Sequence, residues 1–129
     1  MKNLIRFVIQ TIGVGIAGII VGIAGILAGA FIMKGELSGF GDLAGGLMGL
    51  VIGYPLGAII GIIVINRVLH YHGSLLLGVI GSILGAVLTI GLAEPLNLNL
   101  NSNILFVVFF LSIPLLGMIG FNIKRKRSQ

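Results

Sequence analysis

The 129-residue sequence contains no cysteine and no tryptophan, and only 9% of its residues are charged. Without cysteine, the chain can form neither disulfides nor thiolate metal sites. Soluble domains carry about 25% charged residues, so this chain has too few charges to cover a globule with polar groups. The composition therefore excludes an ordinary water-soluble domain.

Four long apolar stretches take up most of the chain, and they cover residues 7–33, 39–65, 74–93 and 104–123. Each provides the ~20 apolar residues that a helix needs to cross a hydrocarbon core of about 30 Å. None contains a charge except Asp42, close to the start of the second stretch. The sequence predicts an all-α integral membrane protein, with four transmembrane helices in a single transmembrane domain.

The charged residues predict an orientation for these four spans. If both termini lie on one side, seven of the eight Lys and Arg lie there too, and only Lys34 is opposite. The three acids, Glu36, Asp42 and Glu94, share the side of Lys34. Since cytoplasmic loops are rich in Lys and Arg, we expect a multi-pass protein of the cell (cytoplasmic) membrane with both termini in the cytoplasm. The expected cytoplasmic anchors are Arg67, Lys124, Arg125, Lys126 and Arg127.

The run of basic residues at 124–127 has a second expected role. Next to a membrane it attracts anionic lipid headgroups, by about 1 kcal/mol for each basic residue. No basic folded surface accompanies this run, so we expect no nucleic-acid partner.

Glycine recurs in the spans at helical intervals, with steps of 3, 4, 3 and 4 in the first stretch and of four throughout in the second. A glycine inside a helix costs about 1 kcal/mol relative to alanine in water. In lipid, however, helices associate through van der Waals packing, and small residues let their backbones approach closely. The spacing therefore predicts glycine-zipper packing. The glycines expected at helix contacts are Gly15, Gly18, Gly22, Gly25, Gly29, Gly45, Gly49, Gly53, Gly57, Gly61, Gly78, Gly81, Gly85, Gly117 and Gly120.

The strict four-residue spacing of the second stretch has a geometric consequence. Each step of four residues advances about 40° around a helix, so the five glycines from Gly45 to Gly61 wind through roughly 160°. Either this helix crosses one partner steeply along its i±4 ridge, or the outer and inner glycines contact different neighbours.

The two halves of the chain share glycine and proline positions. GIAGILAGAFIMKG (22–35) and GVIGSILGAVLTIG (78–91) place four glycines at matching positions, 56 residues apart. GYPLGAIIG and SIPLLGMIG share Pro-Leu followed by Ile-Gly at the same distance. This pattern predicts a 2+2 parallel internal repeat of helical hairpins, with halves 1–67 and 68–129. The alternative is convergence, because glycine-rich helices readily come to share spacings.

The repeat places Pro55 and Pro114 at corresponding positions near the membrane midplane. Each proline frees the carbonyl four residues earlier, that of Val51 or of Phe110, and tends to kink its helix. Paired interruptions in two halves indicate the central site of a transporter, but no ionisable residue lies at this depth, which favours a kink that shapes packing. The polar residues expected beside the kinks are Tyr54, Ser82 and Ser112.

The chain offers little for catalysis or metal binding. His70 and His72 have no acid or cysteine nearby, whereas a stable transition-metal site needs three or four ligands. No nucleophile, base and orienting group share one depth, and no phosphate-binding loop is present. We expect a protein that is not an enzyme and that has no cofactor and no metal.

These observations lead to two functional hypotheses. The first is a small polytopic membrane protein that acts through glycine-mediated helix association, as a homo-oligomer or as a subunit or scaffold of a membrane complex. Its partners are then the lipid bilayer and either itself or another membrane protein. The alternative is a small 2+2 transporter or channel with a midplane site near Pro55 and Pro114.

Overall fold

The computed structural model describes residues 2–34, 40–69, 73–95 and 101–123. These residues form four helices, α1 (Lys2–Ile32), α2 (Gly41–Leu69), α3 (Leu75–Ala93) and α4 (Ser102–Asn122). All four are long and apolar enough to cross a membrane, which confirms the predicted all-α class and the four candidate transmembrane helices. His70, His72 and the basic residues 124–127 lie outside the described part of the chain.

The first two helices are much longer than the last two. α1 and α2 have 31 and 29 residues, against 19 and 21 for α3 and α4. At 1.5 Å per residue, α1 and α2 each measure roughly 45 Å, well beyond a hydrocarbon core of about 30 Å. α1 begins before the expected start at residue 7, and α2 continues past residue 65. Arg6 lies in the additional first turn of α1, and Arg67 lies in the additional last turn of α2.

The helices α2, α3 and α4 each begin with a different local contact. Asp42 lies in the first turn of α2, where the positive end of the helix dipole favours a carboxylate. Ser74 caps α3, and its hydroxyl accepts a hydrogen bond from the Leu77 amide at 3.5 Å. Asn101 precedes α4, and its backbone carbonyl accepts hydrogen bonds from the amides of Ile104 and Leu105 at 3.0 and 3.2 Å.

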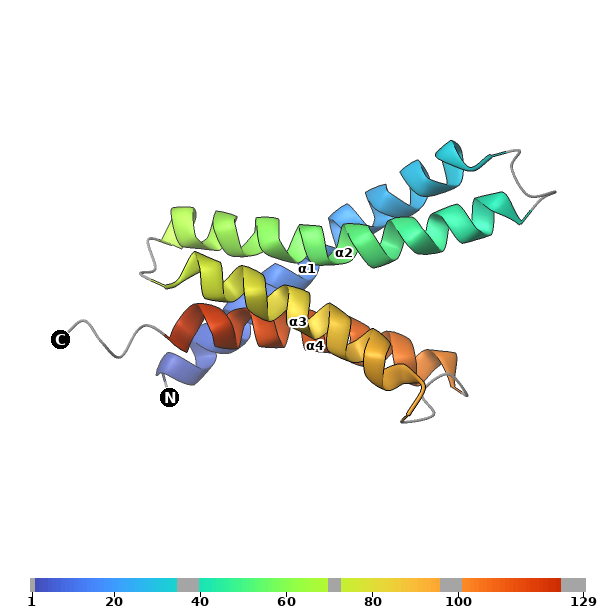
Figure 1. Ribbon diagram of the computed structural model, residues 1–129. Helices are drawn as coiled ribbons and strands as arrows, with labels where there is room; N and C mark the ends of the chain where they lie inside the picture. The colour runs from blue at the N-terminus through green and yellow to red at the C-terminus, as the bar shows by residue number, and fades with distance from the viewer. Residues whose placement is uncertain (1, 35–39, 70–72, 96–100, 124–129) are drawn as a thin grey trace.

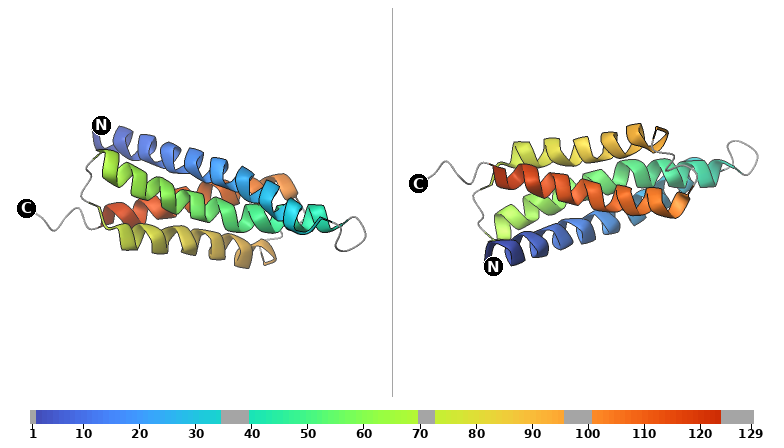
Figure 2. Two further views of the ribbon diagram at one scale, coloured as in Figure 1. Left: turned by 90° about the horizontal axis from the view of Figure 1, so that it is seen from above. Right: turned by 90° about the horizontal axis from the view of Figure 1, so that it is seen from below.

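The helices form two antiparallel hairpins, α1–α2 and α3–α4, that cross each other (Figure 1). The start of α1, the end of α2, the start of α3 and the end of α4 lie together at what we call the terminal end. At the opposite or far end the hairpins separate, and the longer α1–α2 hairpin extends beyond α3–α4 (Figure 2).

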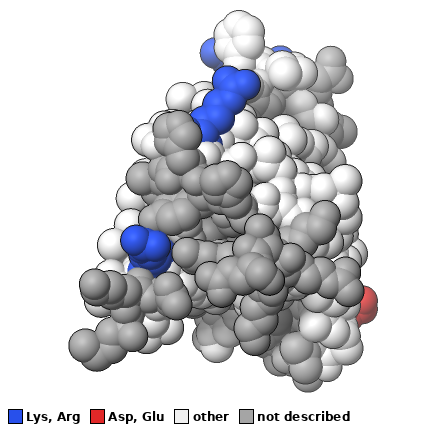
Figure 3. Space-filling view, turned by 90° about the vertical axis from the view of Figure 1, so that its left-hand side faces the viewer, with Lys and Arg blue, Asp and Glu red and all other residues white. Residues whose placement is uncertain are grey.

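The described charged residues differ between the two ends. Arg6 and Arg67 belong to the helical turns at the terminal end, whereas Lys34, Asp42 and Glu94 adjoin the helix ends at the far end. Figure 3 looks onto the terminal end, where Lys and Arg side chains are visible in blue and an acidic group shows in red at the edge of the view.

The core lies where the hairpins cross. Most of its large side chains come from α2 and α4, while α3 contributes mainly glycines and small polar residues. Outside the core, large hydrophobic side chains point outward along all four helices, as expected for a surface that faces lipid. The buried core cluster comprises Val14, Tyr54, Ala58, Ile62, Phe109, Ile113, Met118 and Phe121.

All five regularly spaced glycines of α2 face α1. A Cβ added to Gly49 would collide with the Gly25 carbonyl, and one added to Gly45 would collide with the Gly29 carbonyl. Further along α2, a Cβ on Gly57 would lie 2.6 Å from the Ala17 carbonyl oxygen. The structure therefore agrees with the first of the two geometries: α2 crosses one partner, α1, and all five glycines contact it.

The α3–α4 pair makes contacts of the same kind. A Cβ on Gly81 would collide with the Leu116 carbonyl, and one on Gly120 would collide with the Leu77 carbonyl. At Gly85 an added Cβ would lie 2.9 Å from the Ile113 Cα. Glycine backbone contacts thus occur within each hairpin, between helices that are consecutive in the sequence.

The two hairpins do not pair their helices in the same register. Gly25 contacts Gly49 and Gly53, and 56 residues later Gly81 contacts Leu116 and Gly117. The second helices of the two hairpins correspond at a shift of 59 residues, the separation of Pro55 and Pro114. With the same pairing as in the first hairpin, Gly81 would therefore meet residues 108 and 112, the counterparts of Gly49 and Gly53. The contact in the second hairpin is displaced by about two helical turns, and the internal repeat stays a prediction from sequence.

Gly49 and Gly91 provide a matched test of these backbone contacts. Gly49→Ala forces α1 and α2 apart, and overpacking of this kind costs about 1–3 kcal/mol, so the unfolding free energy in mild detergent should fall. A Cβ on Gly91 meets nothing within 4 Å, so Gly91→Ala should leave the unfolding free energy unchanged or raise it slightly. Equal effects of the two substitutions would contradict the observed close approach.

Candidate functional site

A tyrosine of α2 compensates for the proline in α4. Pro114 has no amide hydrogen to donate to the Phe110 carbonyl, and the Tyr54 hydroxyl donates to that oxygen instead, at 2.7 Å. Tyr54 is 1% exposed. In lipid a backbone group that lacks its helical partner must find another one within the protein. This hydrogen bond therefore meets that need and joins the two hairpins.

Glycines of α1 make the space that Tyr54 occupies. A Cβ on Gly18 would lie 2.7 Å from Cε2 of the Tyr54 ring, and one on Gly22 would lie 3.5 Å from the Tyr54 Cβ. On the other side, the Tyr54 ring meets the Phe110 ring edge-on, at 4.6 Å between centroids. The first-span glycines thus serve two purposes, since Gly25 and Gly29 contact the α2 backbone while Gly18 and Gly22 accommodate this side chain.

A second α2 side chain enters the other hairpin. Ile62 is fully buried, and its terminal carbons face two glycines, one on α3 and one on α4. Cβ atoms added to Gly78 and Gly117 would lie 3.3 and 3.1 Å from them. Tyr54 and Ile62 are two helical turns apart on the same face of α2, so α2 contributes two of the side chains that join the hairpins, while α1 also packs against α4.

The predicted serine of α4 belongs to a small hydroxyl cluster. Ser112 Oγ lies 2.6 Å from Thr89 Oγ1 of α3, and Thr89 also donates to the Gly85 carbonyl at 2.8 Å. Thr89 is 4% exposed. The cluster joins α3 to α4 but does not include Tyr54, Pro55 or Ser82.

Thr89 was absent from the expected midplane residues, although the sequence contains a signal for it. Ser82, Gly85 and Thr89 follow one another at steps of 3 and 4, the spacing of one helix face. All three are buried. The spacing of small and polar residues, read together, identifies the face of α3 that packs inward.

Ser82 is the exception among the buried hydroxyls. Its side chain is 0% exposed, and its Oγ has no hydrogen-bond partner among the described residues. It faces Gly117 of α4 at close range. An unpaired hydroxyl in an apolar interior is costly.

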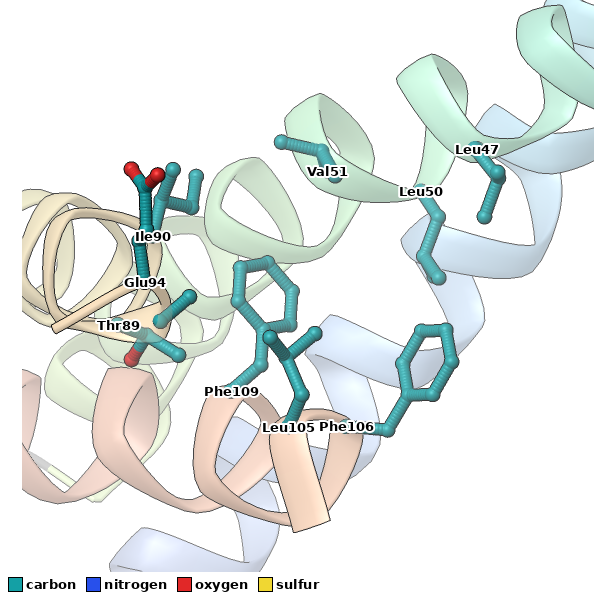
Figure 4. Close-up of a pocket in the computed structure, with 10 residues that line it drawn as sticks. Leu47, Leu50, Val51, Thr89, Ile90, Glu94, Leu105, Phe106 and Phe109 are labelled. Atoms are coloured by element: carbon teal, nitrogen blue, oxygen red, sulfur yellow. The ribbon is translucent and has the colours of Figure 1, made fainter. Parts of the chain in front are cut away.

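A cavity of about 370 Å³ opens between the hairpins toward the far end. One wall is α2, with Leu50 and Val51, and the other combines α3 with Phe106 and Phe109 of α4 (Figure 4). Val51 is also the residue whose carbonyl Pro55 deprives of its helical donor. The lining is apolar apart from Thr89 and Glu94, and Figure 4 shows the Glu94 carboxylate at the edge of the group.

A wider groove lies on the outside of the α1–α2 hairpin. Its volume is about 550 Å³, and its floor consists of small residues of both helices, among them Ala24, Ala28 and Gly53. Ala24 and Ala28 are exposed. Met48 and Ile52 form part of its α2 wall.

Comparisons with protein-family models, with curated protein sequences and with solved structures find no match for this chain. Within the described ranges, no group of three or more His, Cys, Asp and Glu is placed to hold a metal ion. Fold and geometry therefore define a multi-pass helical membrane protein with a proline–tyrosine junction, a cavity between its hairpins and an outer groove.

A double-mutant cycle tests the role of Tyr54. Tyr54→Phe should lower the unfolding free energy by about 1 kcal/mol, because the Phe110 carbonyl loses its donor. Pro114→Ala restores an amide hydrogen to α4, so in that background Tyr54→Phe should cost less than half as much. The measurement is denaturation in mild detergent, and an equal cost in both backgrounds would show that the hydroxyl does not compensate for Pro114.

Ser82→Ala tests whether the buried hydroxyl is unpaired in the folded protein. Removing an unsatisfied polar atom should leave the unfolding free energy unchanged or raise it by up to about 1 kcal/mol. Thr89→Val is the matched control, since it removes a hydroxyl that has two partners and should be destabilising. A clear loss of stability in Ser82→Ala would instead reveal a partner for this hydroxyl.

Proposed function

We propose that the chain is a non-enzymatic subunit of a membrane assembly, which binds another transmembrane helix in the outer groove of its first hairpin. The partner is a second copy of this chain or a different membrane protein. The observation that carries the proposal is the groove itself, because it presents exposed small residues on a face of the hairpin that neither α3 nor α4 lines.

The position of α1 supports this proposal. In its candidate span, 11% of the most apolar window is buried inside the chain, against 33–39% in the other three helices. α1 is therefore the helix with the most surface left for a partner. Its residues Ala24 and Ala28 lie on the exposed side of the contact with α2.

The chemistry of the groove suits a helix as its occupant. Helices in lipid associate where small residues allow close backbone approach. Here Gly25 and Gly29 contact the α2 backbone, and the small residues beside this contact leave a continuous groove on the outer side of the hairpin. In this proposal, glycine-zipper packing forms the hairpin and also shapes the surface that the hairpin offers to its partner.

We further infer that the termini face the cytoplasm of the cell membrane. Arg6 and Arg67 belong to the terminal end, whereas both described acids, Asp42 and Glu94, adjoin the far end. The positive-inside tendency then supports a cytoplasmic terminal end, where Lys124–Arg127 would meet anionic lipid headgroups.

The interior supports a transporter or channel less well. At the hairpin junction the side chains of Tyr54, Ile62 and Ile113 are fully buried and fill the space between the helices. A solute could pass only if the hairpins moved apart and broke the bond from Tyr54 to the Phe110 carbonyl. The geometry therefore favours helix association over transport.

Ala28→Leu provides the direct test. Leucine at this position fills the groove without entering the glycine contacts of α1 with α2, so the partner should be lost while the chain stays folded. The measurement is the mass of the complex after gentle extraction, compared with the 13.4 kDa of one chain. Val87→Leu on the exposed side of α3 is the control and should retain the assembly.

The absence of cysteine allows a second measurement of the same contact. Ala28→Cys introduces the only thiol of the chain, and oxidation in the membrane should give a disulfide-linked dimer if the partner is a second copy. If the partner is a different protein, the gentle extraction of the unmodified chain identifies it by mass. A chain that leaves the membrane alone would overturn the proposal.

A further inference from the structure

We propose that the cavity between the hairpins binds a single-tailed amphiphile with an ammonium headgroup, taken up from the surrounding membrane. This inference goes beyond the proposed helix association, because the cavity and the outer groove share no lining residue. Its volume of about 370 Å³ lies within the range of about 300–1,000 Å³ that is usual for small-molecule sites.

The walls of the cavity suit a hydrocarbon tail. Leu50 and Val51 of α2 lie across from Phe106 and Phe109 of α4, and no basic residue belongs to the described lining (Figure 4). The single hydroxyl in the lining, that of Thr89, already bonds Ser112 and the Gly85 carbonyl. Its proton is therefore used within the protein, and the other side chains that line the interior of the cavity are apolar.

The edge of the cavity determines the charge of the headgroup. Glu94 follows the last residue of α3 and is exposed, so its carboxylate stands where the apolar span ends. The C-terminal end of α3 and the N-terminal end of α4 both adjoin the cavity, and their opposite dipoles offset each other. The full negative charge of Glu94 therefore favours a cation.

A neighbouring cavity extends this negative character. Asp42 contributes to a smaller cavity of about 180 Å³ beside α2, which shares Leu47 and Leu50 with the first. Both described acids thus line the adjoining cavities at the far end. The aromatic ring of Phe106, which is 37% exposed, adds a π-face that attracts ammonium groups.

The arrangement of the hairpins gives a ligand access from the lipid. The hairpins separate toward the far end (Figure 1), and the cavity lies between α2 and the α3–α4 pair, with no lining residue from α1. A tail can therefore enter sideways while its headgroup stays at the level of Glu94, near the membrane surface.

Radiolabelled dodecyltrimethylammonium provides the probe, added to the full chain in vesicles of a zwitterionic lipid. We expect saturable binding of one molecule per chain above the level of protein-free vesicles, and no saturable binding of dodecyl sulfate, which has the same tail. Glu94→Gln keeps the shape of the side chain and removes its charge, so it should weaken binding of the cation on the order of fivefold.

Matched filling variants test the position of the site. Val51→Phe occupies the cavity and should abolish saturable binding, whereas Val87→Phe, the same substitution on the exposed side of α3, should leave it unchanged. If Val51→Phe does not fold, as judged by its thermal unfolding midpoint, Leu47→Phe serves in its place. Neither substitution enters the outer groove, so the mass of the assembly reports on helix association separately.

Three results would overturn the inference. Equal saturable binding of the cation and the sulfate would remove the selectivity assigned to Glu94. Binding of the cation that survives in the folded filling variant would locate it elsewhere, and the absence of saturable binding in the unmodified chain would remove the site altogether.

Discussion

The approach of the α1 backbone to the α2 backbone sets the conditions for the rest of the molecule. Lipid tails are as apolar as leucine, so burial of apolar surface does not drive these helices together, and contact depends on van der Waals packing at short range. At Gly25 and Gly49, and again at Gly29 and Gly45, each backbone lies where the Cβ of its neighbour would be. The glycine cost known from water is thus offset by contacts that no other residue permits.

Once α1 and α2 are joined, the second constraint is the backbone of α4. A proline inside a transmembrane helix leaves a carbonyl that no water can reach, and that carbonyl must be satisfied from within the protein. Tyr54 does this for Phe110, and it can do so only because Gly18 and Gly22 leave space for its ring. Glycines of α1, a tyrosine of α2 and a proline of α4 therefore act as one unit.

The sequence allowed the four helices and the inward positions of many glycines to be predicted, because apolar length and glycine spacing are local properties. It did not allow the choice of partner: the glycines of α2 were compatible with one steep crossing or with two neighbours, and only the position of α1 distinguishes these. Likewise, the sequence shows that Pro114 frees the Phe110 carbonyl, but it does not show that Tyr54, 56 positions away, donates to that oxygen. The spacing of Thr89 from Ser82 and Gly85 predicts its inward position, but its bond to Ser112 on another helix is not a local property of the sequence.

The difference in length between the hairpins explains where the open surfaces lie. Helices of 31 and 29 residues cannot stay in contact along their whole length with helices of 19 and 21 when the pairs cross. The side chains of Tyr54 and Ile62 fix the crossing near the terminal half of α2, so the separation appears at the far end. The space left between the hairpins there is the cavity lined by Val51, Phe106 and Phe109. The crossing of the two hairpins thus leaves the bundle open at the level of its only two described carboxylates, Asp42 and Glu94.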